Sequence, residues 1–179
     1  MQPKKKWKEP SAASLSASTS EAPPLEQQLY LSALKSLTRR QYSLRELEQK
    51  LLQSCQKPAL VSQVVERLKG LGYIDDRRFA QLFIQSRLQN KLLGRSRILA
   101  ELTAKGIDPA MVREILESDY PATDETQSLT RALEKKLKTL SAPRDEKKMS
   151  RLYNHLLRCG FPAEAVRVAL RQRFPGEWG

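Results

Sequence analysis

The stretch that decides the fold is SRILAELTAKGIDPAMVREIL, residues 96–116. Its apolar residues recur at every third or fourth position, which places them on one face of an α-helix. Gly106, followed by Ile107, interrupts this pattern. Glycine is favoured just past a helix end, because it has no Cβ to clash in the left-handed conformation found there. The stretch therefore predicts two amphipathic helices joined by a tight turn at Gly106.

The same pattern returns in SRLYNHLLRCGFPAEAVRVAL, residues 150–170. Its apolar and glycine positions match those of the first stretch, each 54 residues later, as from Ile98 to Leu152. A looser copy, with a longer turn, occupies residues 43–68. Because a further amphipathic segment precedes each copy, the repeating unit is three helices with a period near 50 residues.

A unit of this size cannot bury its apolar faces alone, so it gains stability by packing against its neighbours. The sequence therefore predicts an all-α protein, with three tandem three-helix repeats forming an elongated, curved helical-repeat protein. We assign the repeats to residues 25–72, 73–120 and 121–175. Residues 1–24, rich in Ser, Ala, Pro and Lys, are expected to form a disordered tail, and 176–179 a short second tail.

The charge balance predicts an anionic partner. The chain has 32 Lys and Arg residues against 20 Asp and Glu residues, a formal net charge of +12. A summed positive field attracts polyanions and speeds encounter with them. Nucleic acid, a nucleoprotein and an acidic protein surface all fit, and charge alone does not choose among them.

Residue usage narrows the class of protein further. The two cysteines, Cys55 and Cys159, provide neither a disulfide framework nor a CxxC metal pair, which fits a cytoplasmic protein. The basic start is followed by polar residues, which argues against a secretory signal, and no apolar run approaches the roughly 18 residues that a membrane span requires. We expect a cytoplasmic monomer that does not engage membranes.

Signatures of catalysis are missing from the sequence. The single histidine, His155, lies between Leu152 and Leu156 without a spacing that would supply co-ligands for a metal. The scattered glycines form neither GxGxxG nor GxxxxGK[ST]. We therefore expect no catalytic residues, no metal and no cofactor, and we do not expect an enzyme.

Two adjacent acids, Asp75 and Asp76, stand out in GLGYIDDRRFA, residues 70–80. Paired carboxylates can do acid–base chemistry, bind a metal or start a helix. Gly72 can end one helix, and Asp75 then suits the N-cap of the next, where its carboxylate accepts hydrogen bonds from free N–H groups. Asp76, at the first helical position, is expected to be more exposed and available to a partner.

The same signals recur at other predicted helix starts. Ser43 with Glu46 fits a capping box, and Asp108 is a further N-cap residue. Ile74 and Phe79 have the spacing of a hydrophobic staple across the start at Asp75. The acids at these starts are interpreted as helix caps.

Basic residues gather at several predicted helix ends, either as a stripe for a polyanion or as an ordinary solvated surface. Aromatic residues make up only 6% of the chain, which argues against a stacking platform for bases, so any DNA contact should be to the backbone and sensitive to salt. A candidate secondary basic surface comprises Lys135, Lys136, Lys138, Lys147, Lys148 and Arg151.

GYIDDRRFA (72–80), followed by Arg87 and then GRSRILAELTAKGI (94–107), resembles the signature of the RecX family, regulators of the RecA recombinase. The resemblance covers about residues 25–173 and is strongest over 68–116. It implies tandem three-helix units and a cytoplasmic modulator that binds RecA filaments on DNA, in the filament groove or at its ends. Such a modulator typically inhibits strand exchange, ATP hydrolysis and coprotease activity.

The residues that match this signature divide into two groups. Those expected to hold helix joints and core are Gly72, Tyr73, Asp75, Phe79, Ala80, Leu102, Gly106 and Ile107. Those expected to contact RecA or DNA are Asp76, Arg87, Arg97, Glu101 and Lys105. Glu101 and Lys105 also have the spacing of a favourable ion pair within one helix.

The leading hypothesis is a regulator of the RecA–DNA filament. The alternative is a non-specific DNA-binding protein that contacts the backbone without RecA dependence. A third hypothesis is a structural adaptor, made of helical repeats, for an acidic protein.

Overall fold

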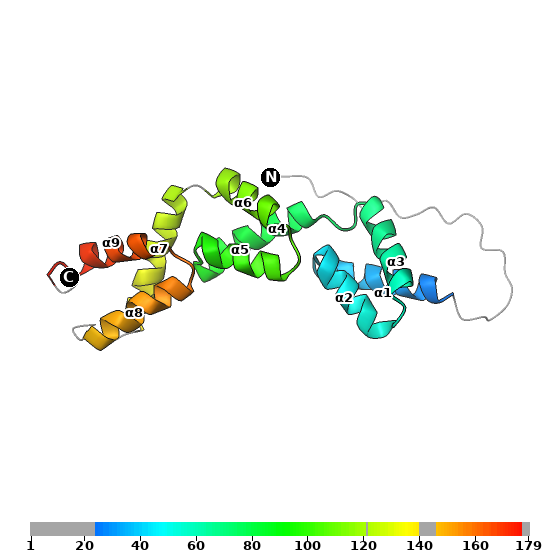
Figure 1. Ribbon diagram of the computed structural model, residues 1–179, viewed down its shortest axis with the longest axis horizontal. Coiled ribbons are helices and arrows are strands. Elements are labelled where there is room, and N and C mark those ends of the chain that lie inside the picture. Colours follow the sequence, from blue (N-terminus) through cyan, green and yellow to red (C-terminus); the bar gives the residue numbers. More distant parts are fainter. Residues whose placement is uncertain (1–23, 121, 140–145, 177–179) are drawn as a thin grey trace.

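The computed structural model describes residues 24–120, 122–139 and 146–176. These residues form nine α-helices and one short π-helix, and they contain no strand (Figure 1). None of the described helices has the length and apolar character needed to cross a membrane. The predicted tails at 1–24 and 176–179 lie almost entirely outside the described residues.

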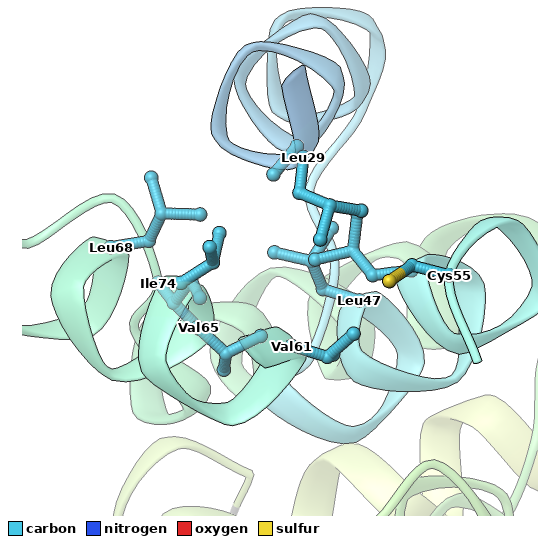
Figure 2. Packing of buried hydrophobic residues seen from close by; sticks show 10 residues of the cluster. Leu29, Leu47, Cys55, Val61, Val65, Leu68 and Ile74 are labelled. Carbon is cyan, nitrogen blue, oxygen red and sulfur yellow. The ribbon is translucent and has the colours of Figure 1, made fainter. Parts of the chain in front are cut away.

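The first unit consists of α1 (Leu25–Arg39), α2 (Leu44–Ser54) and α3 (Pro58–Gly70). Figure 2 shows their apolar side chains pointing toward one another around a single cluster. The buried members of this first cluster are Leu29, Ala33, Leu47, Leu51, Cys55, Val61, Val64, Val65, Leu68 and Ile74.

The second unit consists of α4 (Asp76–Ser86), the π-helix η1 (Arg87–Lys91), α5 (Arg95–Ala104) and α6 (Pro109–Asp119). Its apolar faces form a second cluster. The buried members are Phe79, Ala80, Ile84, Ile98, Leu102, Ile107, Val112, Ile115, Leu116 and Tyr120.

The third unit consists of α7 (Ala122–Leu137), α8 (Glu146–Arg158) and α9 (Ala163–Arg173). The buried members of its cluster are Leu129, Ala132, Leu133, Met149, Leu152, Leu156, Phe161, Val166 and Leu170.

The predicted fold class is confirmed. The three units lie in a row, with α1, α2 and α3 at one end and α7, α8 and α9 at the other (Figure 1). The apolar residues that define the repeat are buried in both copies, as Ile98 and its counterpart Leu152 illustrate. The exact division of the chain at 72 and 120 stays a prediction.

The predicted helix caps are present. The side chains of Ser43, Asp75 and Asp108 accept hydrogen bonds from backbone N–H groups of the helices that they precede, at 3.2, 2.9 and 3.0 Å. Gly72 and Gly106 have φ of 74° and 85°, in the left-handed region that the joints require. Asp75 is therefore a helix cap rather than half of an acid–base pair.

One prediction around Gly72, the hydrophobic staple, is wrong. Tyr73 lies in the joint between α3 and α4, and its side chain is 42% exposed, so it is not a core residue. Ile74 belongs to the first cluster and Phe79 to the second, so they do not form the predicted staple. The turn explains both results, because Tyr73 N–H donates to Leu68 O (3.0 Å) and the chain then brings Ile74 back onto α3.

Each joint between units is built from helix ends. At the first joint, Asp76 Oδ1 accepts a hydrogen bond from Leu44 N–H (2.9 Å), the first residue of α2. Ser43 Oγ donates to Lys105 O (2.7 Å), at the end of α5. Asp76 thus satisfies an N–H group that α2 leaves free at its start, and Ser43 satisfies a carbonyl at the end of α5.

The second joint repeats this arrangement one unit further on. Glu125 Oε1 accepts a hydrogen bond from Arg95 N–H (2.9 Å), the first residue of α5. Gly94 N–H donates to Cys159 O (2.8 Å), at the end of α8. At both joints, the start of one unit's second helix is contacted by two parts of the next unit. One is an acidic side chain, and the other is the end of the next unit's second helix.

Gly94 occupies the tightest point of the second joint. A Cβ at Gly94 would lie 2.3 Å from Gly160 O and 2.7 Å from Phe161 N, both backbone atoms. A Cβ at Gly160 would in turn lie 2.4 Å from Arg97 N. The two units therefore approach each other through their backbones, and neither glycine leaves room for a side chain.

We predict that Gly94→Ala lowers thermal stability while Gly70→Ala does not. Overpacking against backbone that cannot move aside typically costs about 1–3 kcal/mol. A Cβ at Gly70, the last residue of α3, meets nothing within 4 Å, so this variant is the matched control. Thermal unfolding followed by circular dichroism checks the difference, and equal melting temperatures would contradict the close approach at Gly94.

Candidate partner-binding site

Three of the five predicted contact residues form one charged group on the second unit. Glu101, on α5, accepts hydrogen bonds from Arg87 Nε (2.8 Å) and Arg97 Nε (3.2 Å). Arg87 begins η1, and Arg97 lies one helical turn before Glu101. Two guanidinium groups thus share one carboxylate, which leaves the group with a net positive charge.

The two arginines differ in exposure. The side chains of Arg87 and Glu101 are only 21% and 23% exposed, whereas that of Arg97 is 53% exposed. The Arg87 guanidinium also lies over the Phe83 ring, 4.1 Å from its centroid, in a cation–π contact. Arg87 therefore packs within the unit, and Arg97 is the arginine presented to solvent.

Lys105 joins the second unit to the first. Its ammonium group pairs with the Glu46 carboxylate on α2, which also accepts a hydrogen bond from Arg40 Nη1 (3.0 Å). The predicted pair of Glu101 and Lys105 is therefore wrong. The end of α5 lies against the start of α2, so Lys105 meets Glu46 while Glu101 binds the two arginines.

Both carboxylates of this region are ionised at neutral pH. Burial alone would raise the pKa of Glu101, but hydrogen bonds from Arg87 and Arg97 outweigh it and hold the pKa below its usual value. Burial likewise acts to raise the pKa of Glu46, and hydrogen bonds from Lys105 and Arg40 lower it overall. Their ion pairs therefore persist at neutral pH and weaken in acid.

Asp76 has a different role from the one its position in the sequence indicated. It is half-buried, and its Oδ1 is engaged by Leu44 N–H. This contact joins residues 32 apart in sequence, from different units. Asp76 thus holds the first joint, and a direct contact of Asp76 with a partner stays a prediction.

The residues of the predicted secondary basic surface come from two consecutive helices, α7 and α8. Lys135 and Lys136 lie in the last turn of α7 and Lys138 just after it. The remaining three residues, Lys147, Lys148 and Arg151, belong to the first half of α8. The segment 140–145, between the two helices, lies outside the described residues.

Sequence reasoning missed several residues of the joints. Glu46 was interpreted only as part of a capping box, and Glu125 was not singled out at all. A lone glutamate in an amphipathic helix carries no signal that it will cap a helix of another unit. His155 was expected at a boundary, and the structure places its Nε2 3.8 Å from Cys159 Sγ.

The pair of His155 and Cys159 is not arranged for nucleophilic catalysis. Burial lowers the pKa of His155, and the positive charges of Lys136 and Arg158 lower it further. Burial raises the pKa of the Cys159 thiol. Both groups are therefore neutral at pH 7, without the thiolate that would attack a substrate. Within the described residues, no group of His, Cys, Asp and Glu is placed to hold a metal ion.

Comparisons with known proteins agree with this architecture. The family model for the second three-helix domain of RecX matches residues 75–116, which span α4, η1, α5 and α6. Regulatory protein RecX of Chlorobium phaeobacteroides is 36% identical over 142 residues, which cover 79% of this chain and 91% of that protein. The chain belongs to the RecX family of regulatory proteins.

Two other relatives with the same description show how lengths vary in the RecX family. RecX of Halorhodospira halophila is 34% identical over 138 residues, covering 77% of this chain and 83% of that protein. RecX of Oceanobacillus iheyensis is 28% identical over 112 residues, covering 63% of this chain but only 41% of that longer protein.

Solved RecX structures share the fold. The crystal structure of RecX from Lactobacillus salivarius superposes with a TM-score of 0.68 at 21% identity, over 82% of this chain and 95% of that one. A second crystal structure of regulatory protein RecX gives the same TM-score at 17% identity. The tandem helical architecture is therefore common to RecX proteins of very different sequence.

We predict that Glu101→Gln lowers the free energy of unfolding at neutral pH by on the order of 1 kcal/mol, because two arginines lose a charged acceptor. The pKa of Glu101 is depressed in the folded state, so its contribution exists above the unfolded pKa and is lost as pH falls through the folded pKa. The loss should therefore shrink in acid.

Glu164→Gln is the matched control. Glu164 pairs with Arg167 within α9, but its side chain is 72% exposed, so its loss should have little effect at any pH. Urea unfolding of both variants at neutral and acid pH checks the prediction. A loss for Glu101→Gln that is independent of pH, or equal to that of the control, would contradict the assignment.

Proposed function

We propose that this protein regulates the RecA recombinase, mainly as an inhibitor, by binding RecA–DNA filaments as a cytoplasmic monomer. Its relatives are named regulatory proteins of the RecX family, and the family resemblance implies RecA as the partner. The observation that carries the proposal is the group of Arg87, Glu101 and Arg97. It lies within the segment that matches the family and presents one exposed guanidinium beside a rigid joint.

The charge and shape of the chain support a nucleoprotein filament as the partner. The net charge of +12 favours approach to the polyanionic component of a filament. The three units lie in a row, so they can contact several successive subunits of a polymer, and contacts linked in this way strengthen one another (Figure 1). A row of small units suits an extended partner better than a single small ligand.

Regulation of this kind requires no bond chemistry by the bound protein. A protein that binds one conformation of the filament, or its end, more tightly than another shifts the population toward that state. RecA would then hydrolyse less ATP and exchange strands more slowly, because fewer filaments hold the active conformation. Binding in the filament groove and binding at an end both act in this way.

The test is ATP hydrolysis by preformed RecA filaments, with this protein titrated in and excess competitor DNA added in parallel. We expect inhibition at well below one molecule per RecA protomer, and we expect it to survive the competitor. Inhibition that appears only when the DNA is saturated, and that vanishes with competitor, would overturn the proposal. That result would favour non-specific binding to the DNA backbone.

Arg97→Ala should raise the half-inhibitory concentration in this assay by about tenfold, the change produced by losing roughly 1.4 kcal/mol of binding free energy. The backbone and Cβ of Arg97, which face Gly160, are kept in this variant, so the fold should be retained. Arg167→Ala is the control. Arg167 is also about half exposed and is paired within its own helix. Equal effects of the two variants would remove Arg97 from the binding site.

A further inference from the structure

A basic depression lies at the second joint, between η1, α7 and α8. Its volume is about 300 Å³. It is lined by Lys91 and Leu92 at the end of η1, by Ala132, Lys135 and Lys136 on α7 with Thr139 just after it, and by His155 on α8 with Cys159 directly after it. We call it the lysine pocket. No carboxylate is among its lining residues.

The backbone is strained where it positions Lys91. Leu92 has φ of 53°, the one positive φ of a non-glycine residue among the described residues. The left-handed conformation costs an ordinary residue roughly 1–2 kcal/mol. Leu92 offsets this cost by packing against the cluster of the third unit. The strained turn thus fixes the end of η1 against the third unit and holds Lys91 near α7.

Within the described residues, no ion pair neutralises the lysines of the lysine pocket. Across the described ranges of the chain, Lys91, Lys135 and Lys136 form no ion pair. Lys91 and Lys135 are exposed, and Lys136 is half-buried. Lys136 and His155 line the same pocket, so an anion bound there would lie near both side chains. An anion placed there would meet charges from two units at once.

We propose that the lysine pocket binds a phosphate group of a nucleic-acid backbone. The ammonium groups of Lys91, Lys135 and Lys136 supply the charge, and the His155 imidazole, neutral at pH 7 before a ligand binds, supplies an N–H hydrogen-bond donor. Exposed lysines on the rim suit a phosphate that belongs to a longer chain, because the flanking nucleotides remain outside. The identity of that nucleic acid as filament DNA rests on the proposed function, but phosphate binding itself is independent of RecA.

The pKa of His155 reports directly on binding in the lysine pocket. His155 is the single histidine of the chain, so its imidazole signal in proton NMR is assigned without ambiguity. The pKa of His155 is measured alone, with a short oligothymidylate, and with inorganic phosphate at constant ionic strength. The oligonucleotide should raise the pKa by about one unit, a tenfold gain in proton affinity, since a bound phosphate offsets Lys136 and Arg158.

Two double variants, each lacking two positive charges, test whether the oligonucleotide binds at the lysine pocket. Lys135→Ala with Lys136→Ala should weaken oligonucleotide binding by about tenfold and reduce the slope of log affinity against log salt by roughly 0.7, the value for one single-strand phosphate contact. Lys147→Ala with Lys148→Ala, outside the pocket on α8, should change the affinity less than the first pair does.

Three results would overturn the inference. If fluorescence anisotropy shows that the oligonucleotide is bound but the pKa of His155 does not change, the nucleic acid binds outside the lysine pocket. Equal losses in the two double variants would show a response to overall charge. A response to inorganic phosphate but not to the oligonucleotide would assign the pocket to a small anion. A different result would separate the two proposals. If the oligonucleotide raises the pKa of His155 as expected but the protein leaves RecA filaments unaffected, the proposed function is contradicted and phosphate binding in the lysine pocket still holds.

Discussion

The structure depends on one interaction repeated at both joints, in which the second helix of a unit begins against the end of the second helix of the next unit. Ser43 donates to Lys105 O at the first joint, and Gly94 N–H donates to Cys159 O at the second. An acid from the following unit caps the same helix start. The apolar clusters of the units are separate, so these helix ends fix how the units sit relative to one another.

The joints also determine what each charged residue can do. At the first joint, Lys105 and Glu46 hold two units together, while Glu101 aligns the neighbouring arginines. At the second joint, Gly94 brings the backbones into contact, and the adjacent turn at Leu92 positions Lys91 over the lysine pocket. The same joints thus hold the units together and position charged side chains.

Much of the fold was predictable from sequence because its signals are local. The helical spacing around Ile98, the caps at Ser43 and Asp75, and the turn at Gly106 each depend on residues within a few positions of one another. The partners of Asp76, Lys105 and Glu125 lie 30 or more residues away, in a neighbouring unit. Their roles follow from how the units are placed, which periodicity and capping rules do not specify.

The central claim is that the bound partner is the RecA filament rather than DNA alone. Co-sedimentation of the protein with RecA filaments on single-stranded DNA, and with the same DNA without RecA, tests it most directly when salt is raised in steps. Binding that neutralises only phosphates falls steeply with salt. The account predicts that filament binding persists at salt concentrations that abolish binding to naked DNA. Parallel loss of both would contradict it.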